Sequence, residues 1–281
     1  MKIFICTNKN QLIGAKVAKN SIIRKSHFED HDVEILDESD CHDIKSMYSK
    51  SYLREGKEIV FDENDMQSFT LMRFLIPEKM NFKGKALVID PDIFLVRPFL
   101  EDLQKINLDN ISICCRKGLQ KKSWGSSVML LNCEKLKHWS LKNFIKALQA
   151  REYDYSDLIN LRLEDGNIME LEPKWNDFDN LDENTVLLHL TEKLTQPWRA
   201  GLKLNSFIPP IFKFFPRAPL YRLIGRNLRL GIEHPDSRIT DLFFNELSIC
   251  IKENIVNKED IYQGIRDNYI RKDIFIKLEQ Y

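Results

Sequence analysis

The sequence predicts an α/β fold with a largely parallel sheet. Short apolar runs with the length of buried strands alternate along the chain with segments that have the spacing of amphipathic helices. This alternation is typical of strands that are connected by helices and packed in layers. The clearest strand, at residues 86–89, is small or apolar at every position, as expected for a strand in the middle of such a sheet.

The remaining elements follow from the same two patterns. A helix is expected at residues 14–26, where Val17, Ile22 and Ile23 are spaced to face a sheet, and Pro77 should end the helix that follows a polar loop at 62–66. In chain order, the expected strands are 2–6, 33–36, 86–89, 111–115, 127–131, 168–171 and 185–188, and the expected helices are 14–26, 67–76, 134–150, 236–251 and 258–267.

Length and charge limit the organisation of the chain. Its 281 residues fit one α/β domain at residues 1–199 and an extension at 200–281 that ends in two helices. The 42 basic residues balance the 42 acidic ones, so the net charge gives no reason to expect a nucleic acid as a partner.

The cysteines and the apolar runs bear on the compartment. The six cysteines have no C-x-x-C pair and no zinc spacing, and most lie in apolar runs, which is typical of reduced, buried thiols in a cytosolic protein. The apolar run at the N-terminus is too short for a signal peptide, and no run reaches the roughly 18 residues of a membrane-spanning helix. We therefore expect a cytoplasmic protein that is soluble or peripheral to a membrane.

Two carboxylates follow the clearest strand. Asp90 and Asp92 are two positions apart, and Pro91 keeps Asp90 out of the helical region, so both side chains should point to the same face of an extended segment. Such a pair can hold a hard cation whose shell is completed by substrate phosphates, which predicts a nucleotide-diphosphate site. The alternative is an ordinary strand end followed by a turn. The position of the two carboxylates directly after a strand favours the nucleotide-diphosphate site, because ligands bind beyond the carboxyl ends of strands in α/β sheets.

A change in composition follows Trp198. Between residues 200 and 231, six basic residues and no acidic one are mixed with aromatic and aliphatic residues. This composition suits contact with an anionic membrane surface, where each cation contributes about 1 kcal/mol. The alternative is that the aromatic residues pack in the core while the cations stay in water. Both interpretations stay open, because amphipathic composition does not distinguish a lipid surface from a protein surface.

Four segments of the chain form an ordered set. They are 69–78 (FTLMRFLIPE), 86–92 (ALVIDPD), 126–132 (SSVMLLN) and 189–191 with 196–198 (HLT and QPW). In this order they resemble segments of family 8 glycosyltransferases, which are metal-dependent, anomer-retaining enzymes. The resemblance covers about residues 1–200 and implies a GT-A fold, with a Rossmann-like mixed sheet, helices on both faces and a small, mainly helical C-terminal extension.

The resemblance also implies a metal site. Asp90 and Asp92 match the family's D-x-D, and His189 matches the histidine that opens its H-x-x-G-x-x-K-P-W segment and supplies a third ligand. Two carboxylates and an imidazole suit Mn²⁺ better than Mg²⁺, which remains the alternative. A histidine at a strand end is more often structural, but Pro197 and Trp198 nearby favour a ligand.

Further site residues are implied position by position. Asp157 would bind sugar hydroxyls near the anomeric carbon, with Ser156 beside it at the reacting face. Arg73 would reach the donor sugar and diphosphate, although an exposed helical arginine is the default alternative. The strand exit at Cys6, Thr7 and Asn8, with Gln11, would contact base and ribose, or form a plain strand-to-helix loop. The other implied contacts to the donor are Pro91, Ser126, Ser127, Lys193 and Trp198.

The chain departs from the family pattern at several positions. Tyr155 and Ser156 replace the first two residues of the family's D-Q-D, and Gly125 replaces the asparagine of its N-S-G. Gln196 stands where the family has the lysine that neutralises diphosphate charge, so Lys193 or Arg199 would have to substitute. These departures affect the donor sugar and turnover more than the fold.

Three functions are consistent with these residues. The leading one is a retaining transferase that moves glucose or galactose from a UDP-sugar to a glycan or lipid-linked acceptor, with Mn²⁺ stabilising the leaving UDP. The departures motivate the second, a catalytically silent sugar-nucleotide-binding module. The third, a nucleotidyltransferase, would need a glycine-rich phosphate loop after the first strand, where only Gly14 is present.

Overall fold

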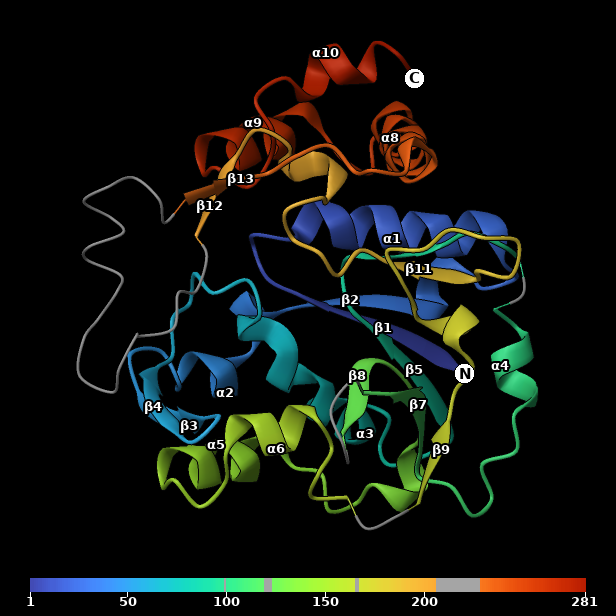
Figure 1. Ribbon diagram of the computed structural model, residues 1–281. Helices are drawn as coiled ribbons and strands as arrows, with labels where there is room; N and C mark the ends of the chain where they lie inside the picture. The colour runs from blue at the N-terminus through green and yellow to red at the C-terminus, as the bar shows by residue number, and fades with distance from the viewer. Residues whose placement is uncertain (99, 119–122, 165–166, 206–227) are drawn as a thin grey trace. The chain divides into compact units, whose positions relative to one another are not determined.

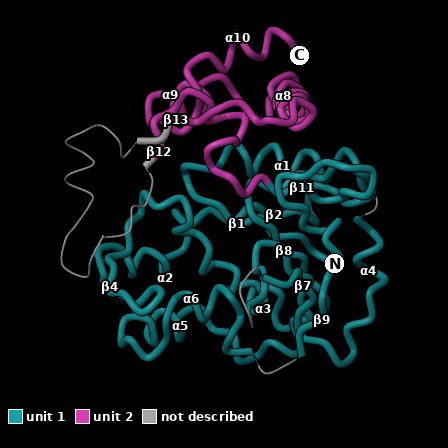
Figure 2. Tube along the Cα trace, in the orientation of Figure 1, with its two compact units in different colours: residues 1–189 teal, residues 190–281 magenta. Residues whose placement is uncertain are grey.

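The computed structural model describes residues 1–98, 100–118, 123–164, 167–205 and 228–281. The backbone forms two compact units, Met1–His189 and Leu190–Tyr281, which are distinguished by colour in Figure 2. This division falls earlier in the chain than the predicted boundary after Arg199. Each unit is described by itself below.

The first unit contains a six-stranded sheet in the order β2-β1-β5-β8-β7-β9 (Figure 1). β2, β1 and β5 are parallel, β8 is antiparallel to both of its neighbours, and β7 is parallel to β9. The strands are β1 (Lys2–Thr7), β2 (Val33–Asp37), β5 (Lys85–Ile89), β7 (Ile113–Lys117), β8 (Trp124–Asn132) and β9 (Ile168–Glu170). The sheet is therefore mixed, as the resemblance implied.

The prediction of a largely parallel sheet is wrong for β8, which runs antiparallel to both β5 and β7. Only a short connection, from Gly118 to Ser123, joins β7 to β8. A parallel pair needs a crossover of about a dozen residues or more, so two strands joined in this way must run antiparallel. The strand positions themselves agree with the prediction to within a few residues.

Helices cover the two faces of this sheet. α1 (Leu12–Lys25) lies on one face, and α3 (Ile76–Lys79), α5 (Leu141–Gln149) and α6 (Tyr155–Ile159) lie on the other (Figure 1). Since side chains alternate along a strand, Phe4 and Cys6 of β1 point to one face and Ile3 and Ile5 to the other. All four are buried, which places β1 in the interior of the unit.

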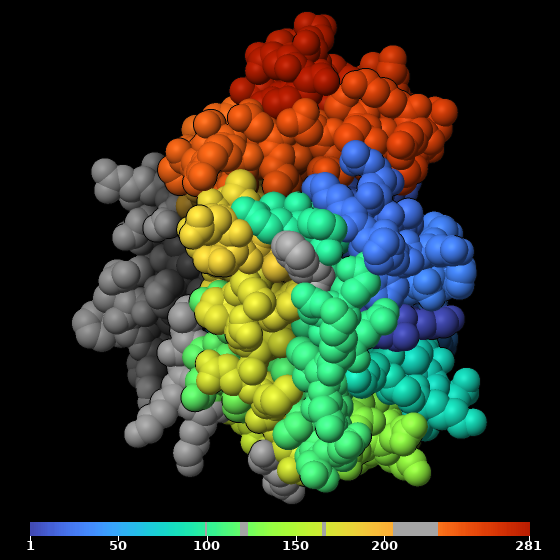
Figure 3. Space-filling model, turned by 90° about the vertical axis from the view of Figure 1, so that its right-hand side faces the viewer, coloured from blue at the N-terminus to red at the C-terminus, as the bar shows by residue number. Residues whose placement is uncertain are grey.

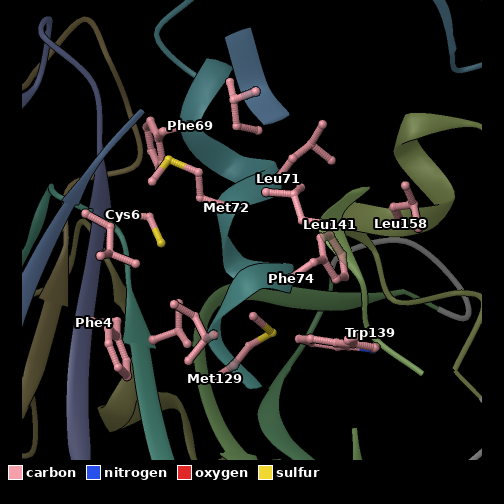
Figure 4. Packing of buried hydrophobic residues seen from close by; sticks show 14 of the residues in the cluster. Phe4, Cys6, Phe69, Leu71, Met72, Phe74, Met129, Trp139, Leu141 and Leu158 are labelled. Atoms are coloured by element: carbon pink, nitrogen blue, oxygen red, sulfur yellow. The ribbon is translucent and has the colours of Figure 1, made fainter. Parts of the chain in front are cut away.

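A cluster of buried hydrophobic residues includes four side chains of η3 (Ser68–Leu75), a 3₁₀ helix. Figure 4 shows Phe69, Met72 and Phe74 of η3 in one cluster with Phe4 of β1 and Met129 of β8. The ring of Trp139 meets that of Phe74 edge to face, with centroids 4.7 Å apart. This packing fixes the segment that carries Arg73 against the sheet.

A second, three-stranded sheet has the order β10-β11-β6, formed by β10 (Asp177–Phe178), β11 (Leu187–His189) and β6 (Ile93–Leu95). β11 pairs antiparallel with β6 and parallel with β10. Helix α1 supports β6, because Ser21 Oγ accepts a hydrogen bond from Leu95 N at 3.1 Å and Lys25 Nζ donates to Leu95 O at 3.0 Å.

Two predicted helices differ from the structure. The helix expected at 67–76 is the 3₁₀ helix η3, and Pro77 lies in the first turn of α3 rather than ending a helix. Proline fits there because a first-turn N–H has no intrahelical acceptor to lose. The helix expected at 134–150 begins only at Leu141, since Ser140 caps α5 through its side chain and η4 (Cys133–Lys135) precedes it.

The sequence reading missed a hairpin of β3 (Ser51–Arg54) and β4 (Lys57–Val60). Its turn residues Glu55 and Gly56 both have positive φ, 53° and 70°, as a type I′ turn requires. The Asp154 carboxylate accepts hydrogen bonds from both turn N–H groups. Partial burial by itself would raise the pKa of Asp154. The hydrogen bonds from the backbone N–H groups of Gly56, Ser156 and Glu55 outweigh this, so the pKa is lowered.

Two short helices complete the first unit, α2 (His42–Lys45) and α4 (Asp102–Lys105), and the α4 segment lies on the surface, green in Figure 3. All six cysteines are free and five are buried, as predicted, whereas Cys41 is half-buried.

The second unit has a short 3₁₀ helix, η6 (Pro197–Arg199), a two-stranded antiparallel sheet of β12 (Lys203–Asn205) with β13 (Leu228–Leu230), and three α-helices among its described residues. These are α8 (Ser237–Lys252), α9 (Lys258–Arg266) and α10 (Ile274–Leu278). The two predicted C-terminal helices are confirmed. Most of the basic and aromatic segment at 200–231 lies outside the described residues, which omit 206–227. Across the described parts of the chain, every helix is too short or too polar to cross a bilayer.

Replacing Gly14 by alanine should lower the free energy of unfolding. Helix propensity favours alanine by about 1 kcal/mol, but a Cβ on Gly14 of α1 would lie 2.7 Å from the backbone oxygen of Pro91. Crowding against backbone costs about 1–3 kcal/mol, so we expect a net loss of up to about 2 kcal/mol in urea unfolding. As a control, the difference in the free energy of unfolding between Lys16→Ala and Lys16→Gly measures the helix-propensity difference between alanine and glycine at a neighbouring position of α1. A stabilised Gly14→Ala variant would contradict the close contact.

Candidate metal centre

The D-x-D pair lies where β5 ends and β6 begins. The backbone N–H of Asp90 donates to Ser127 O at 3.1 Å, which extends the contact between β5 and β8 by one residue. Asp90 is buried, with 8% of its surface exposed, and Asp92 is half-buried. Gly14 of α1 lies close to the turn between them, because a Cβ at Gly14 would be 2.7 Å from the backbone oxygen of Pro91, which is buried.

His189 joins these carboxylates through the three-stranded sheet. In the antiparallel register of β11 and β6, His189 lies opposite Ile93, the residue after Asp92. Its Nε2 atom is 3.4 Å from Asp92 Oδ1. One ligand atom from each of Asp90, Asp92 and His189 lies within 4.8 Å of the other two. The predicted proximity of these three residues is confirmed.

The donor set fits a divalent cation. Two carboxylate oxygens and an imidazole nitrogen converge on one point, and mixed oxygen and nitrogen ligation is typical of Mn²⁺ and the later divalent metals. The imidazole Nδ1 is 2.8 Å from Asn176 Oδ1, and Asn176 Nδ2 donates to Ser127 Oγ at 3.0 Å. The amide oxygen can only accept, so Nδ1 donates to it, and Nε2 is the ring nitrogen that faces Asp92.

Asp90 is paired with Arg73, which lies on η3. One Nη of Arg73 lies 2.6 Å from both carboxylate oxygens of Asp90, and the other donates to Ser126 Oγ. Burial raises the pKa of Asp90, and the Arg73 guanidinium opposes that shift. The default alternative of an exposed helical arginine is wrong, because Arg73 is 5% exposed. Its contact with the donor stays a prediction.

Ser126 and Ser127 are neighbours on β8 and therefore point to opposite faces of the strand. Ser126 accepts from Arg73 and donates to Ile159 O at the end of α6, 2.6 Å away. Ser127 accepts from Asn176 on the His189 side. Within the protein, each serine thus supports one side of the centre. The predicted contact of Ser126 and Ser127 with the donor sugar stays a prediction.

Side-chain amides just after the carboxyl end of β1 donate hydrogen bonds to residues 65–68. Asn8 Nδ2 donates to Asp65 O and to Ser68 Oγ, at 3.0 and 2.9 Å. Gln11 Nε2 donates to Met66 O at 3.0 Å. Cys6, Thr7 and Asn8 have no exposed surface, and burial raises the pKa of the Cys6 thiol to about 12. These side chains hold the following loop in place, and their contact with a nucleotide stays a prediction.

Asp157 and Ser156 lie in the first turn of α6, which the Asp154 side chain caps. Asp157 is half-buried and accepts from Arg162 at 3.0 Å, while Ser156 is buried and its hydroxyl accepts from Glu55 N at 3.2 Å. The Ser126 contact to Ile159 connects this helix to the Arg73 side of the centre. The catalytic roles of both residues stay predictions.

Tyr155, which replaces an acidic residue of the family pattern, is a core residue here. It is 2% exposed, its hydroxyl contacts Thr70 Oγ1, and the Arg54 guanidinium carbon lies 4.9 Å from the centre of its ring. Tyr155 is therefore a packing residue of the core.

Sequence reasoning missed three residues beside His189. Asn176 contacts its ring nitrogen, and the Phe178 ring meets the imidazole edge to face with centroids 5.5 Å apart. Arg116 stacks on Phe178 at 4.1 Å and donates to Asn176 O at 2.5 Å. No spacing along the chain relates these residues. They meet because β10 pairs with β11 and aligns Phe178 with His189.

Lys193 and Trp198 belong to the second unit. Trp198 is 3% exposed and packs on Phe243, with ring centroids 4.7 Å apart. Gln196, which replaces the family's lysine, donates through Nε2 to Leu190 O at 2.7 Å. The predicted contacts of Lys193 and Trp198 with the donor stay predictions.

No protein-family model matches the chain, and no curated protein does. Solved glycosyltransferases are similar in structure. WbbM, a bifunctional glycosyltransferase, aligns at a TM-score of 0.51 and 15% identity over 71% of this chain and 47% of WbbM. GlyE from Streptococcus pneumoniae aligns at 0.50 and 15% identity over 90% of this chain and 64% of GlyE. An active-site mutant of the galactosyltransferase LgtC aligns at 0.50 and 12% identity over 85% of this chain and 100% of LgtC.

These likenesses establish the fold. The mixed sheet with flanking helices matches the GT-A fold of glycosyltransferases, as the resemblance in the sequence implied. The chain spans about half the length of WbbM and less than two thirds of GlyE. At these identities the fold alone carries over, so the activity has to be argued from the residues of the site.

Replacing Arg73 by methionine should destabilise the fold strongly. The Arg73 and Asp90 side chains are only 6% and 12% exposed, so the variant leaves a buried carboxylate without its cation. Breaking a buried pair in this way costs about 3–5 kcal/mol. Urea unfolding measures the loss, and adding Asp90→Asn to the variant should recover part of it.

A matched control is the exposed pair of Arg151 and Glu58, with side chains 48% and 54% exposed. Arg151→Met should cost far less than Arg73→Met, because water screens exposed ion pairs. Equal losses for the two variants would show that Asp90 does not depend on Arg73.

Proposed function

We propose that the chain is a retaining, metal-dependent glycosyltransferase of family 8. It moves a hexose, glucose or galactose, from a UDP-sugar to a glycan or lipid-linked acceptor. The observation that carries the proposal is the convergence of Asp90, Asp92 and His189 on one point in a chain with a GT-A fold. The similar structures are glycosyltransferases, which agrees with this class of reaction.

The charges around the centre suit a leaving nucleoside diphosphate. Asp90, Asp92 and His189 would hold the metal, and a bound dication would supply Lewis-acid stabilisation for the negative charge that develops on the departing phosphates. Arg73 compensates the charge of Asp90. More of the positive charge of a bound dication would therefore be left for the diphosphate. Arg116 is our candidate for the role that the family's lysine has, in addition to Lys193 and Arg199.

The sugar side of the reaction falls to α6 and β8. Departure of the diphosphate leaves positive charge on the sugar, which a carboxylate beside the anomeric carbon stabilises. We assign this role to Asp157, with Ser156, Ser126 and Ser127 at the sugar hydroxyls. Transfer to the same face of the sugar, with the leaving phosphate assisting deprotonation of the acceptor hydroxyl, would retain the anomeric configuration.

A silent binding module is the second candidate, because Tyr155 is buried in the core and leaves no acidic side chain at that position. Such a module would bind UDP and metal but would release no UDP from a donor over hours. Release of pyrophosphate instead of UDP would indicate a nucleotidyltransferase.

Donor binding should depend on metal and on Asp92. With a panel of sugar nucleotides, we expect a thermal shift with a UDP-hexose that requires Mn²⁺ and is abolished in Asp92→Asn, because the variant loses a ligand charge. Asp109→Asn is the control, since Asp109 is an exposed turn residue. A UDP-sugar that binds equally well without metal, and equally well to Asp92→Asn, would refute the proposed centre. Turnover is then followed as UDP release, and product NMR should show a retained anomer.

Membrane contact through residues 200–231 should be detectable by sedimentation with vesicles. At the end of this segment, Leu230 and Ile232 are 57% and 58% exposed, so apolar surface continues from β13. We expect binding to vesicles with anionic lipids that weakens with salt, since cations near the surface contribute about 1 kcal/mol each. Replacing Leu230 and Ile232 by serine should weaken binding without changing the thermal shift. No sedimentation with anionic vesicles would exclude the membrane interpretation.

A further inference from the structure

Asn176 uses every polar group that it has. It lies between η5 (Pro173–Trp175) and β10 and has no exposed surface. Its backbone N–H donates to Pro173 O at 2.9 Å, and its backbone oxygen accepts from Arg116. Its side-chain oxygen meets His189 Nδ1, and its side-chain nitrogen donates to Ser127 Oγ. A buried amide held at four points has one orientation available to it.

That orientation determines where the imidazole proton lies. Nδ2 of Asn176 donates to Ser127 Oγ while Oδ1 faces His189, so the amide oxygen accepts the proton on Nδ1. A proton on Nε2 would instead leave the Nδ1 lone pair facing the Oδ1 lone pairs at 2.8 Å, which is repulsive. Neutral histidine in water favours the proton on Nε2, so the protein has to impose the other form.

We propose that Asn176 is a positioning residue that sets the tautomer and ring orientation of His189 before any cation binds, and that Ser127 orients the Asn176 amide. The inference rests on the proposed function in taking His189 as a metal ligand. Groups that accept from the second nitrogen of a ligating histidine fix the ring and raise its basicity, and their loss weakens metal binding about 10–100-fold.

The tautomer can be read without metal or substrate. In the full chain labelled with ¹⁵N-histidine, at alkaline pH where imidazoles are neutral, nitrogen–proton correlation spectra show which ring nitrogen carries the proton. His189→Gln identifies the signal. We expect Nδ1–H with a bare Nε2 in the wild type, and Nε2–H, or a mixture of the two forms, in Asn176→Leu. A wild-type Nε2–H signal would mean that the amide is turned the other way and would overturn the inference.

Metal affinity provides the second measurement. Mn²⁺ titration followed by electron paramagnetic resonance should show about 10–100-fold weaker binding for Asn176→Leu. Asn176→Asp should bind at least as tightly as the wild type, because a carboxylate oxygen accepts the same bond. Ser127→Ala, which frees the amide to turn, should lose less affinity than Asn176→Leu. Wild-type affinity in Asn176→Leu would refute the positioning role.

Asn132→Leu is the matched control. Asn132 also lies on β8, and its amide donates to Leu108 O at 2.9 Å, away from His189. We expect it to lower stability while leaving Mn²⁺ affinity and the His189 tautomer unchanged. If the wild type has the proton on Nδ1 of His189 but does not bind Mn²⁺, the inference about the imidazole holds and the proposed metal site is refuted. The two failures are therefore distinguishable.

Discussion

The pairing of β6 with β11 holds together two parts of the metal centre that lie far apart in the sequence. Asp92 is followed by β6, and His189 ends β11, so their proximity depends on the register of a pair of three-residue strands. Because side chains alternate, a slip of one residue would turn His189 to the opposite face. The register is fixed from both sides, since α1 binds Leu95 through Ser21 and Lys25, and β10 pairs with the other edge of β11.

The centre brings two carboxylates into a largely buried position, which costs free energy unless each charge is compensated. Asp90 obtains compensation from Arg73, whereas Asp92 faces the imidazole of His189. Asp92 Oδ1 lies 3.4 Å from the imidazole Nε2, farther than the 2.6 Å between Asp90 and the Arg73 guanidinium. The two sides of the centre are therefore unequal, because a buried guanidinium contacts Asp90 whereas an imidazole faces Asp92.

The elements that sequence reading predicted well are those determined by local patterns. Residues 86–89 form a buried central strand because each of them is apolar, and the D-x-D follows from its own spacing and from Pro91. Pro77 misled the prediction because proline is tolerated in the first turn of a helix. The hairpin at residues 51–60 was missed because its turn, Glu55 and Gly56, is held by a distant carboxylate, that of Asp154.

The site was predictable only in part for the same reason. Asp90, Asp92 and His189 could be found because a family resemblance relates their positions, but Asn176 has no pattern of its own. A buried asparagine looks like any polar loop residue until strand pairing reveals its partners. The sequence showed that Tyr155 departs from the family's D-Q-D, but only the structure shows that this side chain packs beneath Arg54 in the core.

β8 explains how one strand can serve both sides of the centre. It is antiparallel to both of its neighbours, and Asp90 N is bonded to its Ser127 carbonyl, so residues 126 and 127 lie beside the end of β5. The alternation of side chains then sends Ser126 to Arg73 and Ser127 to Asn176. A shift of β8 by one residue would exchange these faces and disrupt both supports together. The antiparallel strand that distinguishes this sheet from a purely parallel one is thus also the strand that couples the two sides of the centre.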